Sequence, residues 1–158
     1  TYDAQDPYKD PPGGGTISAE TGKQIVENAE KFLGTPYERG GDGPGGPNYK
    51  DNGGIDCSGL VVEAVKGTPA EFSNDQTADQ IYRNSTIPIP QEEARAGDLA
   101  FFEDPQNPSK MGHVGIITGK NRDGSVNVIH ASGKASQGKV VESTWRNPDA
   151  VGRLKCTV

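Results

Sequence analysis

The first half of the chain carries hydrophobic residues at helical spacing in three segments. The clearest segment runs from Thr21, which matches a capping box with Gln24, to Gly34, which would end a helix as its C-cap. Two shorter helices are predicted over about 58–66 and 75–84. The apolar residues of the first segment recur at i, i+1, i+4, i+7 and i+8 and predict one buried face, made by Ile25, Val26, Ala29, Phe32 and Leu33.

The second half of the chain alternates as β-strands do, and Pro88 and Pro90 separate it from the helical half. Helices first and strands afterwards predict an α+β domain, in which the N-terminal helices pack on one face of a central antiparallel sheet of about five strands. The predicted strands cover 98–102, 113–118, 125–131, 140–145 and 152–158.

The length of 158 residues suits one domain with a substantial core. Residues 1–15 are rich in Asp, Tyr, Pro and Gly and are predicted to form a flexible linker or arm, with the folded domain over 16–158. The Gly- and Pro-rich segment 38–54 predicts a long irregular loop. Because the chain begins at Thr1 without a signal-peptide pattern, we expect a mature product or an excised domain.

The charge balance excludes several partners. A net charge of -6 and a pI near 4.9 argue against a nucleic-acid binder, and against attachment to anionic membranes by charge alone. No apolar run approaches the roughly 18 residues of a membrane span. A hydrophobic share of 31% and a mean hydropathy of -0.72 fit a domain with much loop and polar surface.

Cys57 is the first candidate for chemistry. It follows two glycines and opens a predicted helix, where backbone N–H groups and the positive end of the helix dipole favour the reactive thiolate. The same N–H groups can stabilise an oxyanion formed when the thiolate attacks a carbonyl. Two alternatives remain at this point, a buried structural cysteine and a disulfide with Cys156, which itself is expected to be a small buried hydrophobic residue.

The two histidines of the chain are predicted to meet on one face of the sheet. If the turn at 121–124 places Lys120 opposite Ser125, residues that pair across these antiparallel strands have numbers that sum to 245. His113 and His130 then become diagonal neighbours within side-chain reach.

Three interpretations of this histidine pair are open: surface residues, a metal pair, or a base with its orienting partner. No third His or Cys lies at ligand spacing, which disfavours a metal site, and no cofactor is expected. A cysteine at the start of a helix packed on the sheet favours the third interpretation. His113 would accept the thiol proton and later protonate the leaving amine, and His130 would hold the ring of His113.

Five motifs in order resemble those of the NlpC-type cell-wall peptidases, a family of papain-like cysteine endopeptidases. The resemblance extends from about Thr21 to Arg153, and so covers most of the predicted domain. Its motifs are Gly34-Thr35-Pro36-Tyr37, Asp56-Cys57-Ser58-Gly59-Leu60, Gly97-Asp98-Leu99-Ala100-Phe101-Phe102, Gly112-His113-Val114-Gly115-Ile116 and Ile129-His130-Ala131.

The resemblance implies a papain-like fold and hydrolysis of peptidoglycan stem peptides, usually between γ-D-glutamate and the following diamino acid. A thioester intermediate on Cys57 is expected, with His113 as base and His130 as the third polar member.

The resemblance also suggests roles for three neighbours of the cysteine. Tyr37 matches a tyrosine whose hydroxyl helps to bind the oxyanion. Asp56 and Ser58 match residues that line the pocket for the free amino end of the stem peptide, where an acid can pair with an ammonium group. Helix N-capping is the alternative for Asp56 and Ser58, and it is compatible with the functional role.

These motifs specify the nucleophile and leave the acceptor open, so an amidase or acyltransferase is one alternative. A non-catalytic wall-binding module is another. Activity is expected outside the cytoplasm, in a secreted, periplasmic or cell-wall setting, or after delivery by a phage tail or secretion system. Since the acidic chain does not suit attachment to the wall by charge, targeting is expected from a further domain or delivery machinery. A toxin would in addition have an immunity protein.

Overall fold

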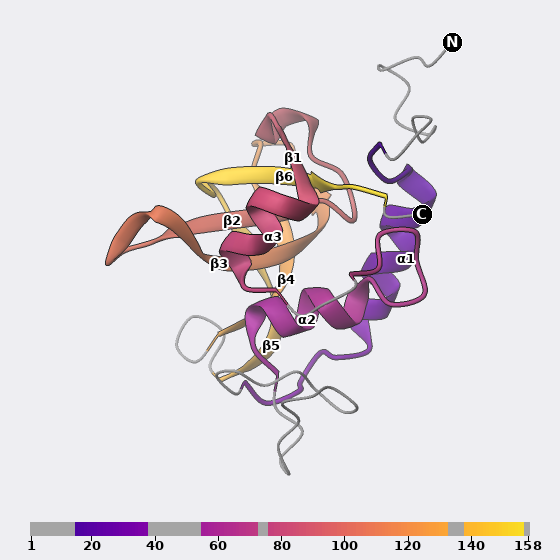
Figure 1. The fold of residues 1–158 in the computed structure, drawn as a ribbon, viewed down its shortest axis with the longest axis horizontal. Helices are drawn as coiled ribbons and strands as arrows, with labels where there is room; N and C mark the ends of the chain where they lie inside the picture. Colours follow the sequence, from indigo (N-terminus) through magenta and orange to yellow (C-terminus); the bar gives the residue numbers. More distant parts are fainter. Residues whose placement is uncertain (1–14, 38–54, 73–75, 133–137, 157–158) are drawn as a thin grey trace.

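The computed structural model describes residues 15–37, 55–72, 76–132 and 138–156. The predicted arm lies outside these residues except for Gly15, and the 38–54 loop lies outside them entirely. The elements follow in the order α1 Ala19–Glu30, α2 Cys57–Ala64, α3 Ala78–Ser85, β1 Thr86–Ile89, a short 3-10 helix Gln91–Glu93, β2 Leu99–Asp104, β3 Asn107–Lys120, β4 Val126–Ser132, β5 Lys139–Trp145 and β6 Ala150–Leu154 (Figure 1).

The strands form one antiparallel sheet in the order β1-β6-β2-β3-β4-β5. The predicted α+β fold is therefore confirmed, with one strand more than expected. The additional strand is β1, which contains Pro88 and pairs with β6. Proline interrupts a strand pattern because it lacks an N–H donor, but an edge strand such as β1 tolerates it.

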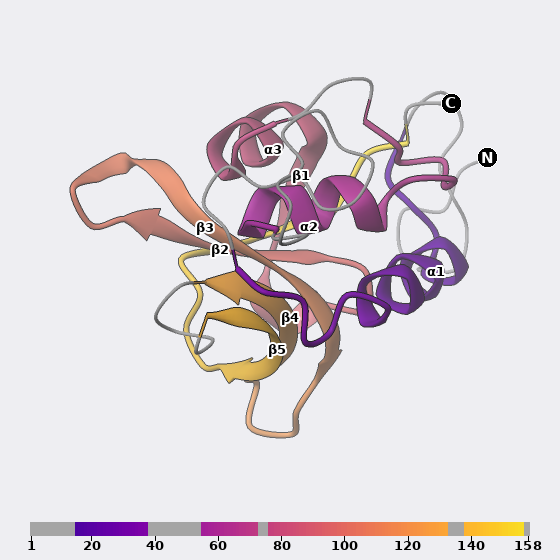
Figure 2. The same ribbon diagram turned by 90° about the horizontal axis from the view of Figure 1, so that it is seen from below.

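The three helices lie together on one face of the sheet, as Figure 2 shows from below. Between them and the sheet is the larger core, to which α1 contributes Ile25, α2 contributes Leu60 and the central strands contribute Phe101 and Ile116, all fully buried. A smaller apolar cluster that includes Ala100, Ile117 and Val128 lies on the opposite face of the sheet. This two-sided burial explains why the central strands contain runs of apolar residues.

The first helix begins earlier than predicted. Ser18 is its N-cap, and the Ser18 side chain accepts a hydrogen bond from the Thr21 N–H at 3.2 Å, so Thr21 lies within the first turn. The predicted cap at Thr21 is therefore wrong. Gly22 also lies inside this helix. It packs so closely on the turn before β2 that a Cβ there would lie 2.2 Å from the Ala96 carbonyl oxygen, so the position requires glycine.

An ion pair holds the start of β2 to the C-terminal strand. Asp98 is completely buried, and it accepts hydrogen bonds from the Arg153 Nε and Nη2 groups at 2.9 Å each. The Arg95 N–H donates a third, also at 2.9 Å. Gly97, before it, has φ +92° and touches Gly22, which only glycine permits. The Gly97-Asp98 motif thus joins α1, β2 and β6.

Candidate active site

Cys57 is the first residue of α2, and Asp56 caps this helix. The Asp56 carboxylate accepts a hydrogen bond from the Gly59 N–H at 2.7 Å, and the Ser58 hydroxyl donates to the same carboxylate at 3.3 Å. The capping role considered for Asp56 is therefore confirmed, and Ser58 supports the cap through its hydroxyl. Both side chains lie next to the thiol, as a substrate-binding role also requires.

The backbone N–H groups of Val114 and Ser58 hydrogen-bond to the Cys57 sulfur, and the N–H of Cys57 itself lies near it. They lower the pKa of the thiol, but loss of solvation and the negative charge of Asp56 raise it more, to about 11. The backbone N–H groups at the helix start thus favour the thiolate, as expected, but burial and the Asp56 charge outweigh them in the free protein. Cys57 and Cys156 are both free cysteines, which excludes the disulfide alternative in this structure. Cys156 is only partly buried and packs against the larger core.

The strand that carries His113 also touches the cysteine. Because the Val114 N–H reaches the Cys57 sulfur, the thiol lies beside the peptide that joins His113 to Val114. Just before His113, β3 bulges at Gly112, since His113 pairs with Phe102 and Met111 with the next residue of β2. A Cβ at Gly112 would lie 2.9 Å from the Asp104 Cα, so the bulge requires glycine there.

The register that brings the histidines together arises differently from the prediction. Lys120 pairs with Val126, one residue later than expected, because the loop is one residue longer. A bulge at Thr118 then removes this offset, and Ile117 pairs with Val128 as the predicted register requires. The predicted turn pairing is wrong, but the predicted relation between His113 and His130 is right.

His113, His130 and Ser143 form a hydrogen-bonded chain across three neighbouring strands, which we call the imidazole chain. His113 Nε2 lies 3.0 Å from His130 Nδ1, and His130 Nε2 lies 2.9 Å from the Ser143 hydroxyl. His130 is 1% exposed and His113 is half-buried. Loss of solvation lowers the pKa of both rings to about 4, and for His113 the neighbouring His130 contributes. Both imidazoles are therefore neutral at pH 7.

The sequence did not point to Ser143 as a site residue. His130 pairs directly with Val141 on β5, so Ser143 is a diagonal neighbour on the same face. The alternation of β5 places Ser143 on the face that also carries Trp145. The register between β4 and β5 depends on how the chain connects Ser132 to Lys139, and the sequence-based prediction included no register for this pair of strands.

Trp145 packs against both imidazoles. Its ring centroid lies 5.5 Å from that of His113 and 4.9 Å from that of His130. Trp145 is half-buried and also packs against Phe102. Gly115 leaves room for this arrangement, because a Cβ there would lie 2.9 Å from the Trp145 ring and 3.3 Å from the His130 Cβ.

Tyr37 lies next to the segment that leads into Cys57. It forms an isolated parallel bridge with Ile55, and its N–H donates to the Gly138 carbonyl at 2.8 Å. Tyr37 and Cys57 pack against the same core. The structure therefore brings Tyr37, Asp56, Ser58 and Cys57 to one end of α2.

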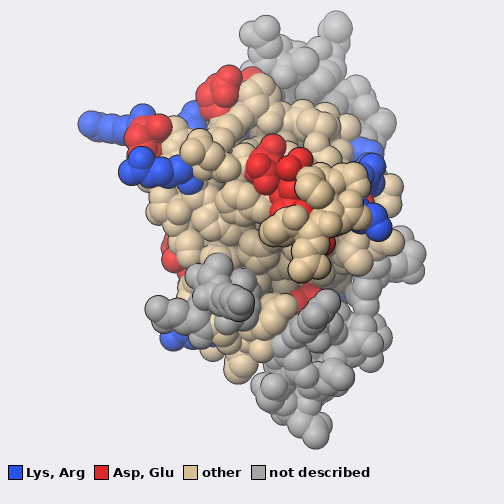
Figure 3. All heavy atoms as spheres, turned by 90° about the vertical axis from the view of Figure 1, so that its left-hand side faces the viewer, with Lys and Arg blue, Asp and Glu red and all other residues tan. Residues whose placement is uncertain are grey.

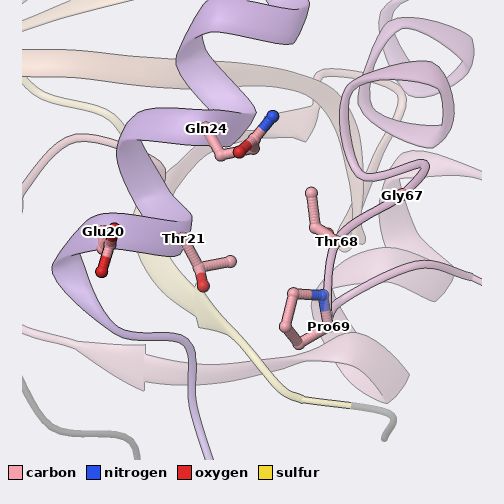
Figure 4. Close-up of a pocket in the computed structure, with 6 residues that line it drawn as sticks. All are labelled: Glu20, Thr21, Gln24, Gly67, Thr68 and Pro69. Atoms are coloured by element: carbon pink, nitrogen blue, oxygen red, sulfur yellow. The ribbon is translucent and has the colours of Figure 1, made fainter.

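Away from this end of α2, the surface shows a polar hollow and scattered charges. A hollow of about 220 Å³ lies at the opposite end of α2, between α1 and Gly67–Pro69, and is lined by polar groups such as Glu20 and Gln24 (Figure 4). The face in Figure 3 carries small groups of both charges around a broad uncharged area. Among the described residues there is no group of three or more His, Cys, Asp or Glu arranged for a metal ion, and no helix long and apolar enough to cross a membrane.

Comparison with known proteins identifies the family. The model of the NlpC/P60 family matches residues 34–152, which include the whole constellation from Tyr37 to Ser143. The chain belongs to the NlpC/P60 family.

Curated relatives share about a third of their aligned residues with this NlpC/P60 chain. It is 35% identical over 98 residues to the bifunctional muramidase/DL-endopeptidase CwlT of Bacillus subtilis (62% of this chain, 27% of CwlT). It is 34% identical over 117 residues to the murein DD-endopeptidase MepH of Escherichia coli (68% of this chain, 40% of MepH). The chain thus spans less than half the length of either relative.

Solved structures of NlpC/P60 domains share the fold. The P60 domain of the antigen MAP1204 from M. avium subspecies paratuberculosis superposes with a TM-score of 0.63 at 29% identity, covering 87% of this chain and 94% of that domain. RipD of Mycobacterium tuberculosis, described as a non-catalytic NlpC/p60 domain protein adapted to peptidoglycan binding, has a TM-score of 0.61 at 22% identity, covering 87% and 97%. The second likeness establishes the fold alone.

Proposed function

We propose that this chain is a cysteine endopeptidase that cleaves peptidoglycan stem peptides. The observation that carries the proposal is that the Cys57 thiol lies beside the β3 segment that bears His113. The His113 ring is in turn hydrogen-bonded to His130. A nucleophile, a base and an orienting group are the three parts that acyl transfer through a thioester needs. Two relatives named as DL- and DD-endopeptidases support peptidoglycan as the substrate.

The reaction begins with a neutral pair. As the Cys57 sulfur attacks the peptide carbonyl carbon, its proton passes to the free nitrogen of His113, and the carbonyl oxygen takes the negative charge. His113 then gives this proton to the leaving amine, and the C–N bond breaks to leave a thioester. A water molecule, deprotonated by His113, attacks the thioester, and the returning proton restores the thiol.

Substrate binding makes this thiol more acidic. The Asp56 charge is one cause of the raised pKa of Cys57, after loss of solvation. A stem peptide whose free ammonium group pairs with Asp56 neutralises that charge, so the pKa of the thiol falls when substrate is bound. Ser58 holds the Asp56 carboxylate in place. The Tyr37 hydroxyl and the N–H groups at the start of α2 stabilise the oxyanion.

The scissile bond within this proposal is the one between γ-D-glutamate and the following diamino acid. The setting is extracytoplasmic, where the substrate is, and a further domain or delivery machinery supplies targeting. Residues 16–158 form the catalytic domain. An amidase or acyltransferase would use the same thioester but a different acceptor, and a binding module would hold the stem peptide without attack.

Mass spectrometry of purified peptidoglycan fragments tests the proposal. The parent should release new fragments, with one water added at the cleaved bond, whereas Cys57→Ala should release none. Cys156→Ala is the matched control, because it removes the other thiol and should cleave as the parent does. Products that carry an acceptor in place of water would indicate transfer. Fragments that bind but stay intact would overturn the peptidase and indicate a binding module.

A further inference from the structure

The imidazole chain admits two complete arrangements of its hydrogens. In the first, His113 Nε2–H donates to His130 Nδ1, and His130 Nε2–H donates to the Ser143 oxygen. In the second, every bond is reversed: the Ser143 hydroxyl donates to His130 Nε2, and His130 Nδ1–H donates to His113 Nε2. The distances of 3.0 and 2.9 Å fit either arrangement, because a neutral imidazole has one donor and one acceptor nitrogen.

Only the first arrangement leaves His113 able to act as a base. Since Nε2 of His113 faces His130, the nitrogen left for the Cys57 proton is Nδ1. Nδ1 carries a free lone pair in the first arrangement and a hydrogen in the second. The tautomer of a nearly fully buried ring, His130, therefore decides whether His113 can accept a proton.

We propose that Ser143 is a positioning residue that selects the base-competent tautomer of His113 by accepting a hydrogen bond from His130. This assignment rests on the proposed function only for the identity of the proton donor, Cys57. Ser143 can act as an acceptor because it is half-exposed on the edge strand β5, where its own hydrogen can point to solvent. Trp145 keeps the rings in place, so that a change of tautomer does not require a change of position.

The neutral state of both rings makes the proposal measurable. Depressed pKa values of about 4 leave His113 and His130 uncharged at pH 7, so each exists as one tautomer or a mixture of two. The chain contains only two histidines, and ¹⁵N-labelled imidazoles therefore give two sets of ring signals. Long-range ¹H–¹⁵N correlation spectra assign the hydrogen of each neutral ring to Nδ1 or Nε2.

We expect both rings of the parent to carry their hydrogen on Nε2. In Ser143→Ala, we expect both rings to show the Nδ1–H form in addition to the Nε2–H form. Ser143→Thr, which keeps a hydroxyl, should restore the parent spectrum. Thr144→Ala is the matched control, because Thr144 is the next residue of β5 and its hydroxyl bonds to Asn127 instead. Cleavage should follow the spectra: kcat falls about fivefold in Ser143→Ala with KM unchanged, the effect of one neutral hydrogen bond, and recovers in Ser143→Thr.

The parent spectrum tests the proposal even if a variant fails to fold. Hydrogen on Nδ1 of the two parent rings would overturn it, and so would a Ser143→Ala spectrum identical to that of the parent. If the tautomers behave as expected but the parent cleaves no peptidoglycan fragment, the proposed function fails and the role of Ser143 in selecting the tautomer stands.

Discussion

Two polar clusters are held in the same sheet, and they differ in what opposes the effect of burial. Burial raises the pKa of the Asp98 carboxyl, whereas the hydrogen bonds and positive charge of Arg153 act in the opposite direction. The ion pair of Asp98 and Arg153 is charged, and Asp98 accepts hydrogen bonds from three donors, two of them from Arg153. The imidazole chain of His113, His130 and Ser143 is neutral, and burial lowers the pKa of both rings. The first cluster has one stable arrangement of hydrogens, whereas the second has two.

Because of this difference, we expect the ion pair to contribute to stability and the imidazole chain to take part in proton transfer. A buried, fully bonded charge pair is costly to break and has no proton to transfer near pH 7. In the proposed mechanism, the neutral imidazole of His113 accepts the thiol proton and returns it during each turnover. Asp98, His113 and His130 all belong to the motifs that resemble the family, so membership of a motif does not by itself distinguish a structural role from the proposed catalytic one.

Removing the base should have the largest effect. His113→Gln should lower the cleavage rate by about 10²–10⁴-fold, the range that general acid–base catalysis contributes, because the Cys57 proton then has no acceptor. The unfolding temperature should change little, since an uncharged ring is replaced by an uncharged amide. Cleavage assays and thermal unfolding on the same samples check this. Full activity in His113→Gln would remove the imidazole chain from the mechanism.

Breaking the ion pair should show the opposite pattern. Asp98→Ala leaves the Arg153 charge without its partner, and the free energy of unfolding should fall by about 3–5 kcal/mol. Cleavage per folded molecule should remain at the parent level well below the unfolding temperature. The control is Lys66→Ala, which removes the pair that Glu63 forms with the exposed Lys66 side chain and should cost less than about 1 kcal/mol in denaturant titrations. Equal losses in the two variants would contradict a distinct role for burial.

A substitution at Gly115 should reduce both stability and cleavage, each by a smaller amount. Gly115→Ala places a methyl group 2.9 Å from the Trp145 ring, so the ring or His130 must shift. We expect a loss of about 1–3 kcal/mol in stability, a drop in cleavage on the order of tenfold, and altered emission from Trp145, the only tryptophan. Gly119→Ala, on the same strand with nothing within 4 Å of its Cβ position, should change none of these. Matching behaviour of the two variants would argue against a close fit at Trp145.

The smallest effect should come from mild acid. The pKa of each histidine falls from 6.5 to about 4 on folding, so below pH 6.5 the unfolded chain binds more protons than the folded one. Stability contributed by the neutral rings is complete above pH 6.5 and is lost as the pH falls toward 4. Unfolding at about pH 6 should therefore need slightly less denaturant than at about pH 7.5. His113→Gln combined with His130→Asn should reduce this dependence, and an unchanged slope would contradict burial as its cause.

The sequence predicted much of this site through short-range patterns. These patterns include the capping residues before α2, the strand alternation around His113 and His130, and the five motifs. Each of them can be read from a few consecutive residues. These patterns predicted the α+β fold and the placement of both histidines on one face. They failed at α1, where Ser18 and not Thr21 caps the helix, and they did not show that Gly22 packs against the turn before β2.

Longer-range effects were decided by the tertiary structure. The bulge at Thr118 restored a register that the turn alone would have shifted, and β5 brought Ser143 to His130. Burial and the nearby Asp56 charge raise the pKa of Cys57 by more than the backbone N–H groups at the helix start lower it. Local sequence determines which groups are available and which face of an element they occupy. Solvation and cross-strand neighbours, which depend on the whole fold, determine the protonation state in which those groups meet.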